Sequence, residues 1–113
     1  FRYATLNAAR DHAKELGHSQ GAAYPWRTIA GRECSAYYPS GSAQYHINAD
    51  IAYSVWRYWE ATGDDDFIAE RGAEILFETA RIWLEIGNRL ARTRVGLPGR
   101  WRGLFAVPRL CRA

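Results

Sequence analysis

The stretch from residue 31 to residue 53 reads GRECSAYYPSGSAQYHINADIAY and passes from an irregular loop into a helix. The loop carries one carboxyl group, Glu33, among aromatic and glycine residues. The helix carries polar side chains that could bind hydroxyl groups, at His46, Asn48 and Asp50. The aromatic rings interleaved with them offer flat apolar faces on which a sugar ring could stack. We interpret this stretch as one wall of an active site.

Apolar residues at helical spacing predict one helix that begins within this wall and a second helix after it. Ile47, Ile51 and Val55 recur every four residues and predict a helix over about 43–61, which Ser40 or Ser42 can cap and Gly63 can end. The run 64–66 is three aspartates, whose side chains suit the start of the next helix better than a metal site. That next helix is expected over 66–87, ending at the glycine there.

The segment before the wall contains a predicted helix and a loop. Apolar residues spaced by three and four predict a helix over 2–16, which Gly17 ends. Residues 21–31 are expected to form a loop, because Pro25 lacks a backbone donor and glycines bracket the segment. Tyr24 and Trp26 flank that proline. Their rings either cover the end of the core or, for Trp26, form part of a sugar platform.

Other polar groups are interpreted as structural. His12 and His18 are expected near the polar face or end of the first helix, in a solvated or capping role. Glu74, Glu78 and Arg81 are expected on a solvated face of the last helix, where the latter two can pair weakly.

Composition places the chain among globular proteins. Hydrophobic residues make up 48% of the 113, too many for a disordered chain, and no apolar run is long enough to span a bilayer. Cys34 and Cys111 form no metal-binding spacing, so we expect no metal and a reducing, cytoplasmic setting. The sequence begins at a phenylalanine and contains no Met, so we expect its start to lie within a longer reading frame.

Charge divides the chain after residue 87. All 12 acidic residues and eight of the 15 Lys and Arg precede residue 88, so residues 1–87 carry −4 and residues 88–113 carry +7. The second part has no sustained helical or strand period. We expect a basic, irregular tail, either a shifted reading frame or a truncated end. A nucleic-acid-binding arm is a weaker alternative, since basic composition carries little specificity.

Several motifs within residues 21–87 occur in a characteristic order. They are YPW at 24–26, GREC at 31–34, QYHINADIAY at 44–53, ATGD at 61–64 and GAEIL at 72–76. With them the stretch resembles the central catalytic domain of glycoside hydrolase family 65, which includes maltose, trehalose and kojibiose phosphorylases and some trehalose hydrolases. The resemblance implies an all-α fold, with residues 1–87 supplying about three helices of a twelve-helix alpha/alpha toroid.

The resemblance also implies roles for individual residues. Glu33 matches a glutamate that donates a proton to the glycosidic oxygen; the alternative is a loop carboxylate bonded to backbone amides. Some family members have another glutamate where Gln44 stands here. The sugar-facing shell is expected to comprise Tyr24, Trp26, Gln44, His46, Asn48 and Asp50.

The implied activity is that of an inverting alpha-glucoside phosphorylase or hydrolase acting on trehalose, maltose or kojibiose. Phosphate would be a co-substrate in a phosphorylase, and no other cofactor is expected. Two alternatives remain from other classes: a catalytically inactive fragment that binds sugar weakly, and a small basic nucleic-acid-binding protein. We expect no membrane partner.

Overall fold

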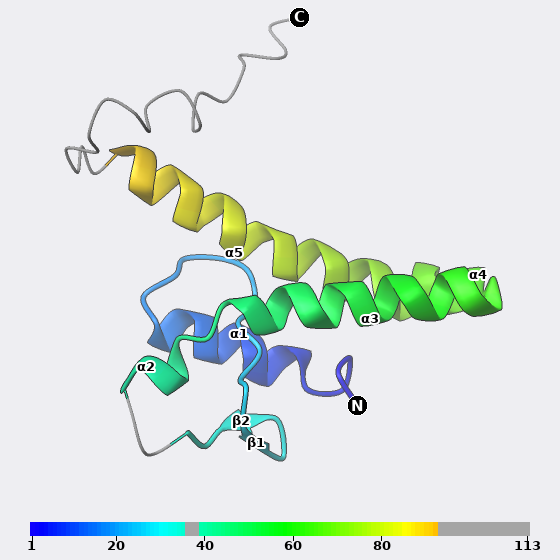
Figure 1. Cartoon of the computed structure of the whole chain (residues 1–113), viewed down its shortest axis with the longest axis horizontal. Coiled ribbons are helices and arrows are strands. Elements are labelled where there is room, and N and C mark those ends of the chain that lie inside the picture. Colours follow the sequence, from blue (N-terminus) through cyan, green and yellow to red (C-terminus); the bar gives the residue numbers. More distant parts are fainter. Residues whose placement is uncertain (36–38, 93–113) are drawn as a thin grey trace, which may run out of the picture.

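Three longer helices and their connections make up the computed structural model, which describes residues 1–35 and 39–92 (Figure 1). In chain order the elements are α1 (Leu6–Glu15), β1 (Thr28–Ile29), β2 (Arg32–Glu33), α2 (Pro39–Ser42), α3 (His46–Thr62), α4 (Asp65–Phe67), the π-helix η1 (Ile68–Gly72) and α5 (Ala73–Arg92). The expected mainly helical fold is confirmed over these residues. The toroid stays a prediction, and the predicted tail lies outside the described residues from position 93 onward.

Helices α3 and α5 run side by side as a hairpin that turns at α4 (Figure 1). Gly63 ends α3 as predicted: its φ of 63° is left-handed, and its amide donates to the Trp59 carbonyl at 2.7 Å. Asp64 caps α4 as predicted, because its carboxylate accepts from the Phe67 amide at 2.9 Å. The predicted serine cap of α3 is wrong. Tyr45 is its N-cap and makes no side-chain cap bond.

The helix expected over 66–87 differs from the structure at both ends. It begins with the short α4 and the wider turn of η1, whose last residue, Gly72, lies against α3: a Cβ there would come within 3.1 Å of Val55 Cγ1. At the other end Gly87 does not stop the helix, which continues to Arg92. A single glycine lowers helix propensity by only about 1 kcal/mol, and neighbouring turns can outweigh this.

Gly87→Ala is expected to stabilise the chain by about 0.5–1 kcal/mol, because it removes glycine's conformational freedom from a helix interior. Nothing lies within 4 Å of the added methyl group. The midpoint of urea unfolding measures the gain. The matched variant Gly72→Ala should give none, since its methyl group would come within 2.8 Å of Ile68 Cδ1. A destabilised Gly87→Ala variant would contradict the helical continuation.

The core lies between α1, α3 and α5. One cluster joins Leu6 and Ala9 of α1 to the predicted stripe of α3, Ile47, Ile51 and Val55, and to Ile75 of α5, with Ala22 and Tyr24 between them. A second cluster contains Ala13, Ala23 and Ile82. The apolar stripes predicted for the three helices therefore meet one another.

An extended segment, residues 22–24, threads between the three helices and bonds to each of them. The Ala22 amide donates to the Glu78 carbonyl of α5 at 3.1 Å, and the Ala23 amide donates to the Ala9 carbonyl of α1 at 2.9 Å. The Tyr24 amide donates to Asn48 Oδ1 of α3 at 3.0 Å. This segment is thus the central connection of the fold, not a surface loop, because its backbone donors are satisfied by helices on all sides.

A two-residue hairpin that the sequence analysis did not predict follows this segment. β1 and β2 pair antiparallel, with Thr28 opposite Glu33 and Ile29 opposite Arg32. The turn residues Ala30 and Gly31 both have positive φ, at 52° and 86°, as a type I′ hairpin turn requires. The turn packs on the start of α1, since a Cβ on Gly31 would come within 2.7 Å of Thr5 Cβ. The hairpin holds Glu33 at a defined register.

Large apolar side chains remain exposed on α3 and α5, among them Tyr53, Trp56, Phe77 and Leu84. Tyr53 and Phe77 are each more than 60% exposed, so these helices have faces that the described part of the chain does not cover. None of the described helices combines the length and the apolarity that crossing a membrane requires.

Candidate functional site

The predicted wall is divided between two elements. Glu33 lies on the β1–β2 hairpin, which packs against α1, and Trp26 stands just before it. His46 and Asp50 lie on the first turns of α3. Trp26 is 55% exposed, and the Arg27 guanidinium lies 5.4 Å from the centre of its ring. More than half of Trp26 is therefore open to solvent, so the interpretation that it covers the end of the core is wrong.

Glu33 is half-buried, and its two carboxylate oxygens have different surroundings. Oε1 accepts a hydrogen bond from the Ser35 backbone amide, the arrangement expected of a loop carboxylate. Oε2 is buried and has no hydrogen-bond partner among the described residues. Oε1 thus holds the loop, while Oε2 makes no hydrogen bond within the described part of the chain. The role of Glu33 as proton donor stays a prediction.

The outer face of α3 carries a polar and aromatic stripe. His46, Asp50 and Tyr53 are exposed and spaced by four and three residues, so they project from the same side of the helix. Gln44 is half-buried just before the helix. Imidazole, carboxylate and phenol groups on one face can donate to and accept from several hydroxyl groups at once. This stripe is the part of the predicted shell that the structure brings together.

Tyr24 and Asn48 lie in the core, where the proposed contact with sugar is wrong for this chain. Tyr24 is 3% exposed and its hydroxyl donates to the Arg2 carbonyl at 2.8 Å; burial raises the pKa of Tyr24 to about 12. Asn48 is 1% exposed. Its Oδ1 accepts from the Tyr24 amide, and its Nδ2 donates to the Ala22 carbonyl at 2.6 Å. Both side chains hold the central segment instead.

His12 and His18 are buried, each 6% exposed, so the predicted solvated or capping role is wrong. Nε2 of His12 lies 2.8 Å from the Ser42 carbonyl, and Nε2 of His18 lies 2.8 Å from the Tyr45 hydroxyl. A signal for His12 was present in the sequence: it stands three residues after Ala9, on the apolar stripe of α1.

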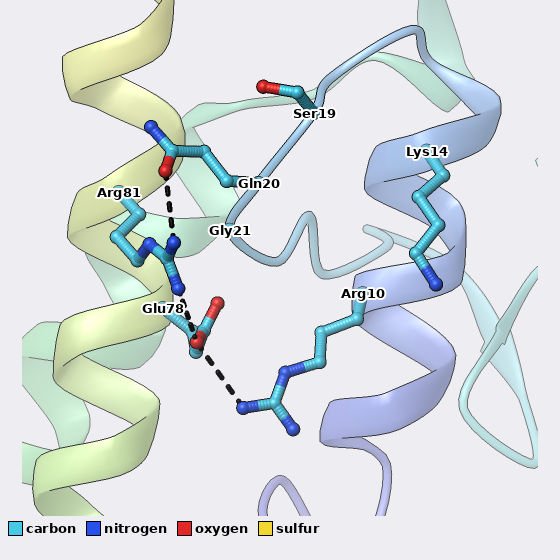
Figure 2. A pocket seen from close by; sticks show the side chains of 7 residues that line it. All are labelled: Arg10, Lys14, Ser19, Gln20, Gly21, Glu78 and Arg81. Carbon is cyan, nitrogen blue, oxygen red and sulfur yellow. Dashed lines mark hydrogen bonds and ion pairs between the residues drawn. The ribbon is translucent and has the colours of Figure 1, made fainter.

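Glu78 is also buried, so its predicted place on a solvated face is wrong. Figure 2 shows its carboxylate between two guanidinium groups, with Oε1 3.3 Å from Arg10 Nη2 and 3.2 Å from Arg81 Nη1. Arg81 also donates to Gln20 Oε1 at 3.0 Å. These side chains line a pocket of about 210 Å³ between α1 and α5. Since both arginines already bind carboxylates, we interpret the side chains around this pocket as a structural network of ion pairs.

Arg10 connects this network to Glu74. The Arg10 guanidinium donates to Glu74 Oε1 at 2.7 Å. This hydrogen bond lowers the pKa of Glu74 and raises the pKa of Arg10 from their ordinary values. The pair joins α1 to α5 near the solvent, where such pairs stabilise only weakly. Residues 1–35 and 39–92 contain no group of three His, Cys, Asp or Glu side chains placed to hold a metal ion.

Comparison with known proteins gives consistent matches. A profile of the glycosyl hydrolase family 65 central catalytic domain matches residues 1–97. Two alpha,alpha-trehalose phosphorylases are similar: that of Thermoanaerobacter brockii is 66% identical over 87 residues, and that of Geobacillus stearothermophilus is 56% identical over 88 residues. A kojibiose phosphorylase of Halothermothrix orenii is 38% identical over 112 aligned residues.

These matches cover most of this chain but a small part of each relative. The T. brockii match covers 77% of this chain and 11% of the relative, and the G. stearothermophilus match covers 78% and 12%. The H. orenii match covers 84% and 14%. The chain therefore spans about a tenth of the length of the curated relatives it matches.

Proposed function

This chain belongs to glycosyl hydrolase family 65, and from that we propose that it is part of the catalytic domain of an inverting alpha-glucoside phosphorylase whose disaccharide is trehalose. The observation that supports this most is the 66% identity to a trehalose phosphorylase over 87 residues, which include the hairpin and the exposed start of α3. The kojibiose phosphorylases are 38–40% identical. Trehalose is therefore the preferred substrate of the proposal, ahead of kojibiose and maltose.

The proposed reaction uses phosphate as the nucleophile. An oxygen of phosphate attacks the anomeric carbon of one glucose unit from the face opposite the glycosidic bond, and that bond breaks as the new bond forms. A carboxylic acid gives its proton to the departing glycosidic oxygen. The products are glucose and β-glucose 1-phosphate, since attack from the opposite face inverts the alpha configuration. In a hydrolase of the family, water would replace phosphate.

The residues of this chain would line one side of the active site for that reaction. Trp26 offers an exposed aromatic ring on which a glucose ring can stack. His46 and Asp50, one turn apart on the outer face of α3, offer a donor and acceptors for sugar hydroxyl groups. Gln44 precedes them. Glu33 is the proposed proton donor, with Oε1 held by the Ser35 amide and Oε2 without a hydrogen bond to residues 1–35 or 39–92.

The full-length protein tests the activity directly. Purified protein is incubated with trehalose, kojibiose or maltose, with and without inorganic phosphate, and glucose and glucose 1-phosphate are measured with their anomeric form. We expect turnover of trehalose that requires phosphate and yields the β-anomer. Release of two glucose molecules without phosphate would show a hydrolase instead. Absence of turnover on all three disaccharides would refute the proposed function.

The role of Glu33 has a separate test. Glu33→Gln keeps a carbonyl oxygen that can accept from the Ser35 amide but removes the transferable proton. We expect kcat/KM of the full-length enzyme to fall at least about 10²-fold, the usual contribution of general acid catalysis. Glu70→Gln, at an exposed position of η1, is the matched control and should retain full activity. Activity of Glu33→Gln within a few-fold of wild type would leave Glu33 with the loop-holding role alone.

A further inference from the structure

Two buried histidines contact the segment on which the predicted shell begins. They are His12 of α1 and His18, which follows the C-terminal end of α1. His12 Nε2 lies 2.8 Å from the carbonyl oxygen of Ser42, the last residue of α2. His18 Nε2 lies 2.8 Å from the hydroxyl of Tyr45, the N-cap of α3. Residues 42–45 are thus held at both ends by imidazole rings. We call this stretch, Ser42 to Tyr45, the α2–α3 link.

The local hydrogen bonds of the α2–α3 link are those of short turns. The N-cap of α3 makes no side-chain cap bond, so the helix start lacks the usual anchor at this point. The link's own backbone bonds are local turns, from the Ile47 amide to the Gln44 carbonyl and from the Asn48 amide to the Tyr45 carbonyl. Side chains from other elements therefore contribute to the tertiary position of the link: His12, His18 and the core cluster of Ala13, Ala23 and Ile82, against which Tyr45 packs.

The backbone of each histidine is held by α1 or by its C-terminal end, so its ring can hold the α2–α3 link in place. His12 lies in the middle of α1 on its buried side, and because Ser42 offers a carbonyl acceptor, Nε2 must carry the donated proton. His18 follows the end of α1, where its amide donates to the Ala13 carbonyl at 2.9 Å. Its ring also packs edge-on against the Tyr45 ring, with centroids 5.5 Å apart.

The His18 contact extends to α5. Glu85 of α5 accepts from the Ser19 amide at 3.1 Å and from the Gln20 amide at 3.3 Å, and its Oε2 lies 3.8 Å from His18 Nδ1. Trp83 of α5 packs against the Tyr45 ring at 6.3 Å between centroids. The end of α1, α5 and the N-cap of α3 are therefore linked through one histidine and one tyrosine.

We propose that His12 and His18 are positioning residues that set the location of Gln44 and His46, and through them the affinity of the site for its disaccharide. The catalytic part of this inference rests on the proposed function. Its structural part does not, because the position of the link can be measured without substrate. Neither histidine touches the proposed sugar face: both act through the link, from the opposite, buried side.

The first experiment measures hydrogen exchange in the full-length protein without ligand. His12→Leu and Tyr45→Phe each remove one of the two contacts, the second without loss of the ring. We expect amides of residues 44–48 to exchange about tenfold faster in each variant, the result of losing one buried hydrogen bond, while amides of α5 stay within twofold of wild type. Tyr58→Phe, which removes a tyrosine hydroxyl bond to Asp64 at the other end of α3, is the matched control. It should not accelerate exchange at 44–48 selectively.

Two further variants separate positioning from general destabilisation. His12→Gln keeps an amide donor for the Ser42 carbonyl and should restore most of the protection lost in His12→Leu. If His18 and Tyr45 act through one bond, combining His18→Gln with Tyr45→Phe should be no worse than the more severe single variant. Should His12→Leu fail to fold, His12→Gln and Tyr45→Phe still decide the matter, since both nearly preserve volume.

The second experiment measures kinetics on trehalose with phosphate. We expect KM for the disaccharide to rise about three- to tenfold in Tyr45→Phe, with kcat changed less than twofold, because a displaced sugar contact weakens binding. Unchanged exchange at 44–48, or equal acceleration throughout the protein, would overturn the positioning role. If wild-type protein turns over no disaccharide, the proposed function fails, while the exchange result still decides the structural part.

Discussion

Gly21→Ala is expected to destabilise the chain by about 3–5 kcal/mol, the combined cost of a left-handed backbone and of overpacking. Gly21 has a φ of 84°, which side chains disfavour. A Cβ there would come within 2.7 Å of the Ile82 backbone nitrogen and 3.0 Å of the Glu78 carbonyl oxygen. Both contacts are backbone atoms of α5, so no rotamer change relieves them.

The clash would separate α5 from the central segment, residues 22–24. The Ala22 amide bonds to the same Glu78 carbonyl, so moving one helix away breaks a buried hydrogen bond as well. Urea unfolding followed by circular dichroism measures the loss. Gly17→Ala is a matched control, because its φ is 85° but nothing lies within 4 Å of its added methyl group. It should cost only about 1–2 kcal/mol, and equal losses in the two variants would contradict the close approach to α5.

Asn48→Asp is expected to cost about 4 kcal/mol at pH 7, and the loss should disappear in acid. Asn48 uses Nδ2 to donate to the Ala22 carbonyl and Oδ1 to accept from the Tyr24 amide. A protonated carboxyl can reproduce both bonds, whereas a carboxylate places a second oxygen against the Ala22 carbonyl at a position only 1% exposed. The folded state therefore needs the introduced acid to be neutral.

The direction of the pH dependence follows from that requirement. The introduced acid has a raised pKa in the folded state and an ordinary pKa of about 3.9 in the unfolded state. Its cost is absent below about pH 4 and grows by about 1.4 kcal/mol per pH unit above it. Denaturant midpoints of the variant and of wild type between pH 4 and 7 measure this difference. Asn7→Asp, at an exposed position of α1 beside Arg10, should show no such slope.

The helical elements could be predicted because their signals are local. The apolar stripes of α1 and α3, the left-handed stop at Gly63 and the cap at Asp64 each depend on residues within a few positions of one another. Gly87 shows the limit of such a signal. A glycine favours a helix end, but its penalty is small enough for α5 to continue to Arg92.

The division of the predicted shell between core and surface follows the period of α3, since Asn48 stands three residues before Ile51 of the apolar stripe. Asn48 and Asp50 stand two residues apart in one motif, yet one is buried and the other exposed, because a helix turns about 200° over two positions. Only the tertiary structure shows which segment packs on the buried side and supplies the partners of Asn48. Asn48 satisfies the backbone of that segment, while Asp50 projects from the opposite side of α3.

By itself the sequence determined the three longer helices, the stop at Gly63, the cap at Asp64 and the family, since these follow from short-range periodicity, caps and motif order. Tertiary structure decided how His12, His18, Glu78 and Asn48 are accommodated in the interior. Their partners are an amide, a carbonyl, a hydroxyl or a charge from 24 or more residues away, or from another helix. A buried polar group is stable only where such a partner completes its hydrogen bonds, and only the folded chain supplies that partner.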